Sequence, residues 1–196
     1  MHTLYTTECI VLGSSNFGEA NRYINLFTKD IGLVRAAVRS VREEKSKLRF
    51  SLQDFSIGSV TLVRGREVWR IIGALEKYSV HEEFKYDREK LFIVVRILNL
   101  LQRLIHGEEK NEYLFAVLSR GFDFIRLNAI EKENAQNFEH LAVLRLLYSL
   151  GYIAKKEEFS KLLELTETNK ELLKKTKSKR RQILLAINSA LKETHL

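Results

Sequence analysis

The sequence contains no proline and only one cysteine in 196 residues. A lone cysteine excludes a disulfide within the chain and a zinc site built from thiolates. This residue, Cys9, lies in an apolar segment, where a small buried side chain is the usual role of cysteine. The sequence therefore predicts neither a disulfide framework nor a metal centre.

Long hydrophobic runs are also missing. The most apolar window, 91–105, is interrupted by two arginines, an asparagine and a glutamine, and it is too short to span a bilayer. The N-terminus lacks a basic stretch followed by a hydrophobic run, so no signal peptide is expected. These features predict a cytoplasmic protein with no membrane partner.

Motifs for catalysis and nucleotide binding are absent as well. The chain has neither G-x-x-x-x-G-K-[ST] nor G-x-G-x-x-G, and its five histidines lack H-x-x-x-H spacing. Glu43 and Lys45 have the E-x-K spacing found in nucleases, but no partner carboxylate follows a strand, and a charged loop is the commoner explanation. We expect no enzyme, no catalytic residue and no cofactor.

Positive charge is in excess. Lys and Arg number 33 against 25 Asp and Glu, which gives a net charge of +8. The hydrophobic fraction of 45% is enough for a folded core. The charge favours a polyanionic partner, which leaves nucleic acid, an acidic membrane surface and an acidic protein segment as alternatives.

The first part of the chain alternates with a period of two, which predicts β-strands. The expected strands are 3–12, 22–28, 33–41, 55–63 and 67–75. In the third strand Val34, Ala36 and Val38 share one face. Arg35 and Arg39 share the other. A break after this strand predicts a five-stranded OB-fold barrel as an N-terminal domain over residues 1–78.

From residue 79 the apolar period changes to about 3.6, which predicts an all-α domain over 79–196 and an α+β protein. The expected helices are 88–106, 111–127, 137–150, 159–165, 169–175 and 181–191. The first is apolar on nearly every side, so we expect it to be the central buried helix. Gly151 is expected to end the third as its C′ residue.

Basic residues gather where the predicted barrel strands meet loops. Arg35 and Arg39 are about 13 Å apart along one strand face, a spacing that suits a phosphate backbone. Arginine binds phosphate with a planar fork and lysine binds it as a point charge. The predicted DNA-binding residues are Arg22, Arg35, Arg39, Arg42, Lys45, Lys47, Arg49, Arg64 and Arg66. A merely solvated charged face is the alternative.

Aromatic side chains near these cations are candidates for stacking on nucleobases. They are Tyr23, Phe27, Phe50 and Trp69. For Phe27 and Trp69, packing in the core is the commoner alternative.

A second basic cluster lies at the expected joint between the last two helices. It comprises Lys174, Lys175, Lys177, Lys179, Arg180 and Arg181. Three interpretations stay open: a second DNA contact, a binding site for an acidic protein tail, and a solvent-facing run of lysines.

Residues 9–56 carry short motifs in a defined order: an apolar strand, a Gly-Glu turn, a strand ending in Phe-Thr, a basic strand, Lys-Ser and Leu-Gln-x-Phe. The segments are Cys9-Ile10-Val11-Leu12-Gly13, Phe17-Gly18-Glu19-Ala20-Asn21-Arg22, Leu26-Phe27-Thr28-Lys29-Asp30-Ile31-Gly32-Leu33-Val34-Arg35-Ala36, Lys45-Ser46-Lys47-Leu48 and Leu52-Gln53-Asp54-Phe55-Ser56. This order resembles the N-terminal domain of the RecO family of bacterial recombination mediators. Asp54 stands where the family pattern usually has proline. The later helical half, including 146–152, fits more loosely.

The resemblance implies an OB-fold domain followed by a helical domain and a function in DNA repair and recombination. RecO-like proteins bind single- and double-stranded DNA and anneal complementary strands in the bacterial cytoplasm, at the nucleoid. With RecR they help load RecA onto DNA coated by single-strand-binding protein, whose acidic C-terminal tail docks on the helical half. RecF is a further expected partner.

Two departures from the family pattern concern the helical half. Many members have a four-cysteine zinc site after the segment that matches 150–152, whereas this chain has Ala154-Lys155-Lys156-Glu157 there. The helical half is also shorter than usual. A generic single-strand DNA- or RNA-binding OB protein and an adaptor for acidic protein tails stay open as alternative functions.

Overall fold

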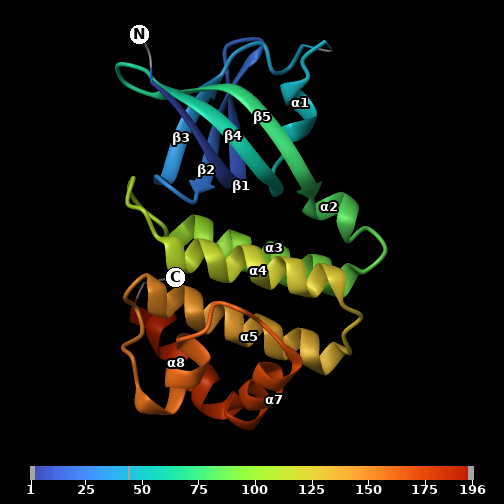
Figure 1. Ribbon diagram of the computed structural model, residues 1–196, viewed down its shortest axis with the longest axis vertical. Helices are drawn as coiled ribbons and strands as arrows, with labels where there is room; N and C mark the ends of the chain where they lie inside the picture. Colours follow the sequence, from blue (N-terminus) through green and yellow to red (C-terminus); the bar gives the residue numbers. More distant parts are fainter. Residues whose placement is uncertain (1–2, 44, 194–196) are drawn as a thin grey trace. The chain divides into compact units, whose positions relative to one another are not determined.

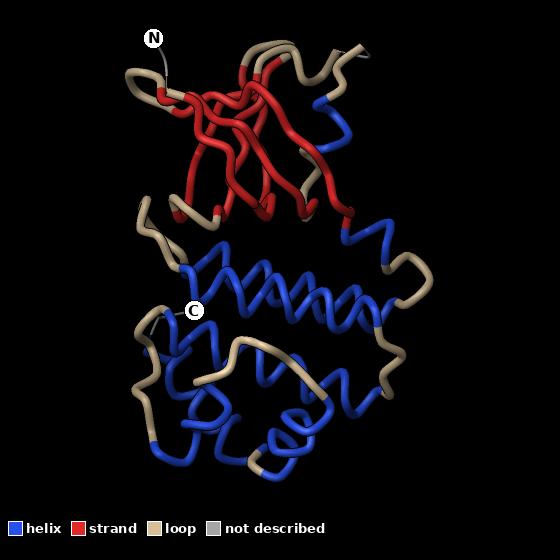
Figure 2. The backbone as a smooth tube through the Cα atoms, in the orientation of Figure 1, coloured by secondary structure: helices blue, strands red, loops and turns tan. Residues whose placement is uncertain are grey.

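The computed structural model describes residues 3–43 and 45–193. The chain divides into two compact units. The first contains Met1–Lys85 and the loop Ile105–Asn111, and the second contains Tyr86–Leu104 and Glu112–Leu196. Strands belong to the first unit and long helices to the second (Figure 2). The predicted α+β class is confirmed.

The first unit is a closed five-stranded barrel (Figure 1). Its strands are β1 (Leu4–Phe17), β2 (Asn21–Thr28), β3 (Gly32–Val38), β4 (Ser56–Arg64) and β5 (Trp69–Ser79). The order is β1-β2-β3-β5-β4, and β1 closes the barrel by pairing with both β2 and β4. β3 and β5 are parallel, and the other neighbours are antiparallel. This is the OB topology that the sequence predicts.

Alternating side chains fill the barrel. Cross-strand partners share a face, so the pairing of Leu26 with Val34 and of Ile24 with Ala36 sends all four side chains inward. The alternation predicted for β3 is confirmed, because its valines are buried and Arg35 is exposed. A register shift between Val11 and Gly13 of β1 marks a bulge, which bends the strand between its two partners.

Several strand limits differ from the prediction, and β5 spans Trp69–Ser79 rather than 67–75. β1 continues through the serines and asparagine at 14–16, which were expected to form a turn, because their backbone pairs with β2. β3 ends at Val38 rather than Val41, since Ser40 has a positive φ of 50°. Arg39 therefore lies just beyond the strand as an exposed residue, and the prediction that it shares a strand face with Arg35 is wrong. Two short helices, α1 (Leu48–Ser51) and α2 (Val80–Glu83), complete the unit.

The second unit is helical. Its elements are α3 (Arg88–Leu104), α4 (Glu112–Leu127), α5 (Lys132–Ser149), the 3-10 turn η1 (Glu157–Phe159), α6 (Ser160–Leu163), α7 (Lys170–Ser178) and α8 (Arg180–Glu193). Helix α5 contacts α3, α4, α6, α7 and α8, and it lies between the α3–α4 pair and α7 and α8 in Figure 1. Among the described residues, no helix is long and apolar enough to cross a membrane.

The central helix of the second unit is α5. The prediction that the helix over 88–106 is the central buried helix is therefore wrong. In α3 the side chains of Phe92, Arg96, Asn99 and Arg103 are exposed. They recur every three or four residues and therefore form one solvent-facing stripe. Helix α5 instead buries polar Asn137 and Arg145 together with its leucines.

The end of α5 follows the prediction. Gly151 has a φ of +82°. Its N–H donates to the Tyr148 carbonyl at 3.0 Å, and the Tyr152 N–H donates to the Leu147 carbonyl at 2.9 Å. These two bonds form a Schellman motif, in which glycine accepts the left-handed conformation without strain.

Arg145 secures the connection that follows α6. Its Nε donates to the Leu162 carbonyl at 2.7 Å, and its Nη1 donates to the Glu167 carbonyl at 3.1 Å. Burial lowers the pKa of Arg145 to about 10, so the side chain stays charged at neutral pH. A buried cation thus holds residues 162–167 against α5.

Candidate nucleic-acid interface

Three side chains form a stack on the outer face of β1, β2 and β3. The rings of Phe17 and Tyr23 are stacked, with centroids 4.1 Å apart and planes at 22°. The guanidinium carbon of Arg35 lies 4.4 Å from the Tyr23 centroid. In OB folds the face of the second and third strands is the usual site for oligonucleotides. The stack therefore places a cation and two rings on that face.

Hydrogen bonds bring further cations to one end of this face. The Arg42 N–H donates to the Ala20 carbonyl at 3.1 Å, and its Nη1 donates to the Glu19 carbonyl at 2.8 Å. Arg22 Nε donates to Asn16 Oδ1 at 3.0 Å. The β1–β2 and β3–β4 connections consequently meet at the same end of the barrel, as Figure 1 shows.

The β3–β4 connection extends the positive surface. Lys45, Lys47 and Arg49 are exposed there, and the Phe50 side chain is 65% exposed. Helix α1 carries both Arg49 and Phe50, so an accessible ring and a cation lie on the same short element. This arrangement combines the phosphate-binding and base-stacking groups of single-strand binding surfaces.

The β4–β5 hairpin carries Arg64 and Arg66. Arg64 lies over the Trp69 ring, with its guanidinium carbon 5.1 Å from the centroid. It also forms an ion pair of 3.4 Å with Glu108. Arg66 is exposed. Within residues 3–43 and 45–193, Arg64 alone among the predicted DNA-binding cations has a carboxylate partner.

Two of the predicted stacking residues are buried. Phe27 is 0% exposed and Trp69 is 4% exposed. Both side chains pack in the core, as the alternative interpretation of the sequence stated, and are not available for stacking on bases. Tyr23 has a neighbour on each ring face, because Phe17 approaches from β1 and Arg35 from β3. Phe50 is the one proposed stacking ring whose side chain is mostly exposed.

The sequence did not point to Glu108. This residue lies in the loop 105–111, which packs on the barrel through the hydrogen bond from the Leu33 N–H to the Gly107 carbonyl, 3.2 Å long. A Cβ at Gly32 would lie 2.2 Å from the Glu109 carbonyl oxygen, so glycine is required for this approach. A loop that meets a barrel through backbone contacts leaves no periodic signal in the sequence.

The second basic cluster is partly neutralised. Lys175 pairs with Glu171 at 2.6 Å, and Lys177 pairs with Glu133 at 2.8 Å. Lys179 donates to the Glu158 carbonyl. In the part of the chain that the structure describes, Lys174, Arg180 and Arg181 have no carboxylate partner.

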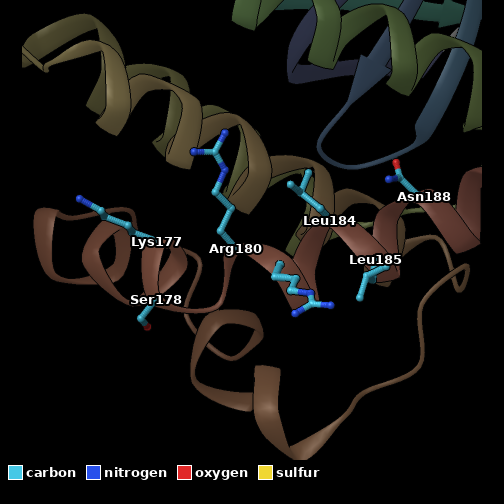
Figure 3. A pocket seen from close by; sticks show the side chains of 7 residues that line it. Lys177, Ser178, Arg180, Leu184, Leu185 and Asn188 are labelled. Atoms are coloured by element: carbon cyan, nitrogen blue, oxygen red, sulfur yellow. The ribbon is translucent and has the colours of Figure 1, made fainter.

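A pocket of about 520 Å³ adjoins this cluster (Figure 3). Its lining residues are Lys177, Ser178, Arg180, Arg181, Leu184, Leu185 and Asn188. Leu185 is 62% exposed, so apolar surface is available beside the basic groups. Apolar surface adjoining cations suits an acidic segment that also carries apolar side chains.

Other chemistry has little support in the described residues. They contain no group of three His, Cys, Asp or Glu side chains placed to hold a metal ion. Cys9 is buried, and desolvation raises the pKa of its thiol to about 12. A thiol of this kind is not a nucleophile at neutral pH.

The fold and the cationic outer face define an OB-fold protein with an appended helical unit. Residues 1–75 match the family model described as "Recombination protein O N terminal". The barrel unit is therefore similar to the N-terminal domain of Recombination protein O.

Similar proteins extend the match beyond the barrel. The chain is 27% identical to the DNA repair protein RecO of Alkaliphilus metalliredigens over 130 residues, which cover 66% of this chain and 52% of that protein. It is 26% identical to the DNA repair protein RecO of Clostridium novyi over 151 residues, or 76% and 57% of the two chains. A RecO of Dehalococcoides mccartyi is 36% identical over 70 residues, or 36% and 28%. The matched region spans little more than half of the first two relatives.

Proposed function

We propose that this protein binds DNA and acts in repair and recombination by bringing complementary single strands together. One observation carries the proposal: the outer face of β2–β3 and the adjoining loops hold several arginines and lysines that are not neutralised by carboxylates among the described residues. Similarity to relatives that are named DNA repair proteins supports the choice of DNA as the polyanion.

Annealing on this surface needs no covalent chemistry, no cofactor and no metal. Two phosphate backbones repel each other, and bound arginine and lysine side chains reduce that repulsion while releasing counterions. Base pairing between the strands supplies the free energy. The protein's contribution is to hold one strand extended along the barrel so that its bases are accessible to the other strand.

Under the same proposal the protein works with partners in the bacterial cytoplasm. The family resemblance suggests that it acts with RecR, and with RecF, to load RecA onto DNA coated by single-strand-binding protein. These partners are proposed from the resemblance to RecO proteins, and each is testable by binding to the purified protein.

A second candidate function is recognition of acidic protein tails. The pocket at the start of α8 favours it, because Leu184 and Leu185 line it together with basic residues. An acidic tail with apolar side chains, such as that of single-strand-binding protein, matches this chemistry. Titration with such a peptide, with and without DNA, separates a tail-binding adaptor from a DNA-binding protein. Replacement of Lys174, Lys175 and Lys177 by glutamine tests the cluster.

The deciding experiment is annealing of complementary strands, both bare and coated with single-strand-binding protein. We expect the wild-type protein to accelerate annealing in both cases. Binding without acceleration would favour a generic single-strand DNA- or RNA-binding protein. Peptide binding without DNA binding would favour the adaptor.

A further inference from the structure

The stack of Phe17, Tyr23 and Arg35 ends in a flat guanidinium group that faces solvent. Phe17 belongs to β1 and Arg35 to β3, and each is a diagonal neighbour of Tyr23 on the intervening strand. Since the Phe17 ring covers one face of Tyr23 at 4.1 Å, the guanidinium at 4.4 Å lies on the other face. Arg35 is exposed, so its outer plane is accessible.

Asn25 lies beside the end of this stack. It is the cross-strand partner of Arg35, so the two side chains emerge on the same face. Within the described residues the Asn25 amide has no hydrogen-bond partner. A planar cation is therefore adjacent to a partly exposed amide that is free to donate and accept.

We propose that Arg35 is a stacking platform for one unpaired nucleobase, and that Asn25 contacts the edge of that base. This proposal rests on the proposed binding of single-stranded DNA to the barrel face. Guanidinium planes stack on bases in single-strand complexes, and asparagine amides pair with base edges. The Tyr23 ring lies 4.4 Å from the guanidinium carbon and restricts the Arg35 side chain, which lowers the entropy lost when a base stacks on it.

Base stacking and phosphate binding make different demands on residue 35. A phosphate contact requires charge, which lysine keeps, and it is indifferent to the presence of a base. Stacking requires the plane of arginine, which lysine lacks, and it requires a base. The substitution Arg35→Lys therefore separates the two roles at constant charge.

The test compares a thymine-containing strand with an abasic strand of equal length at fixed salt. The wild-type protein should prefer the thymine strand by about tenfold, which is the order of effect expected of one stacked base. Arg35→Lys should lose most of this preference and keep its salt dependence. Tyr23→Leu should do the same, while Tyr23→Phe should restore the preference. Arg88→Lys, on the exposed surface of α3, is the matched control.

Two results would overturn the inference. One is a full preference for the thymine strand in Arg35→Lys with a native melting curve. The other is the absence of any preference in the wild-type protein. Either result leaves the proposed function intact as long as single strands bind. If the wild-type protein binds neither the thymine strand nor the abasic strand, the proposed function itself is contradicted.

Discussion

The Trp69 indole N–H donates to the Glu108 carboxylate across 3.0 Å. The same carboxylate lies 3.4 Å from Arg64, which in turn lies over the Trp69 ring. The loop 105–111 therefore fixes the position of one cation on the β4–β5 hairpin and offsets its charge. In an OB fold this hairpin is a common part of the nucleic-acid site.

Removing the charge of Glu108 should strengthen DNA binding. Glu108→Gln keeps an oxygen that can accept the Trp69 N–H, but it leaves Arg64 without a carboxylate. We expect higher affinity and a steeper salt dependence, measured by DNA titration at several salt concentrations. Glu109→Gln changes net charge equally and is the control, so an equal gain in both variants would contradict a specific role for Glu108.

Loss of the hydrogen bond between the Trp69 indole and Glu108 should lower the stability of the protein. Glu108→Ala also removes the acceptor for Trp69, and it should lower the free energy of unfolding by about 1–2 kcal/mol. Thermal unfolding followed by Trp69 fluorescence measures this effect. Equal stability of Glu108→Ala and Glu108→Gln would show that the indole bond contributes nothing.

Arg145 should be a large contributor to the stability of the helical unit. Arg145→Met keeps most of the apolar stem but leaves the carbonyls of Leu162 and Glu167 without their donors. We expect a loss of about 2–4 kcal/mol in the free energy of unfolding, measured in urea. Arg103→Met, at an exposed position of α3, is the matched control and should stay within about 0.5 kcal/mol of wild type.

His140 should make the protein less stable in mild acid. Burial lowers the pKa of His140, and the nearby Arg180 charge lowers it further, while Glu139 opposes both. The unfolded chain therefore binds a proton more readily than the folded one, and stability is lost as the pH falls through about 6.5. His140→Gln should reduce the loss of unfolding free energy between pH 7.5 and pH 5.5. An unchanged dependence of stability on pH in His140→Gln would contradict this role of His140. His81→Gln is the control.

Local patterns predicted the elements that have one buried face. The valines and arginines of β3 alternate because one side of the strand packs in the barrel. The Tyr23–Arg35 contact was not predicted, because it depends on the β2–β3 register, which pairs Thr28 with Gly32 and places the two residues diagonally. Gly151 was predictable because a helix end followed by glycine has a specific hydrogen-bond pattern.

Features that depend on several neighbours were not predictable from local patterns. Helix α5 is buried on many sides, and the buried positions include Asn137 and Arg145. Polar residues of these types usually lie on the surface, so the sequence pattern does not show that they are buried. Glu108 meets Trp69 only because a loop 39 residues later in the chain packs on the barrel. Charge composition gave the candidate cations but not their partners, which is why the pairing of Arg64 was missed.

The most direct test of the account is the salt dependence of single-strand DNA binding by the Arg35→Glu, Arg39→Glu double variant. Loss of one or two phosphate contacts should reduce the slope of log affinity against log salt by about 0.7–1.4 and weaken binding. The melting curve should stay native because both side chains are exposed. Wild-type affinity and slope in a normally folded double variant would contradict the proposed DNA-binding face.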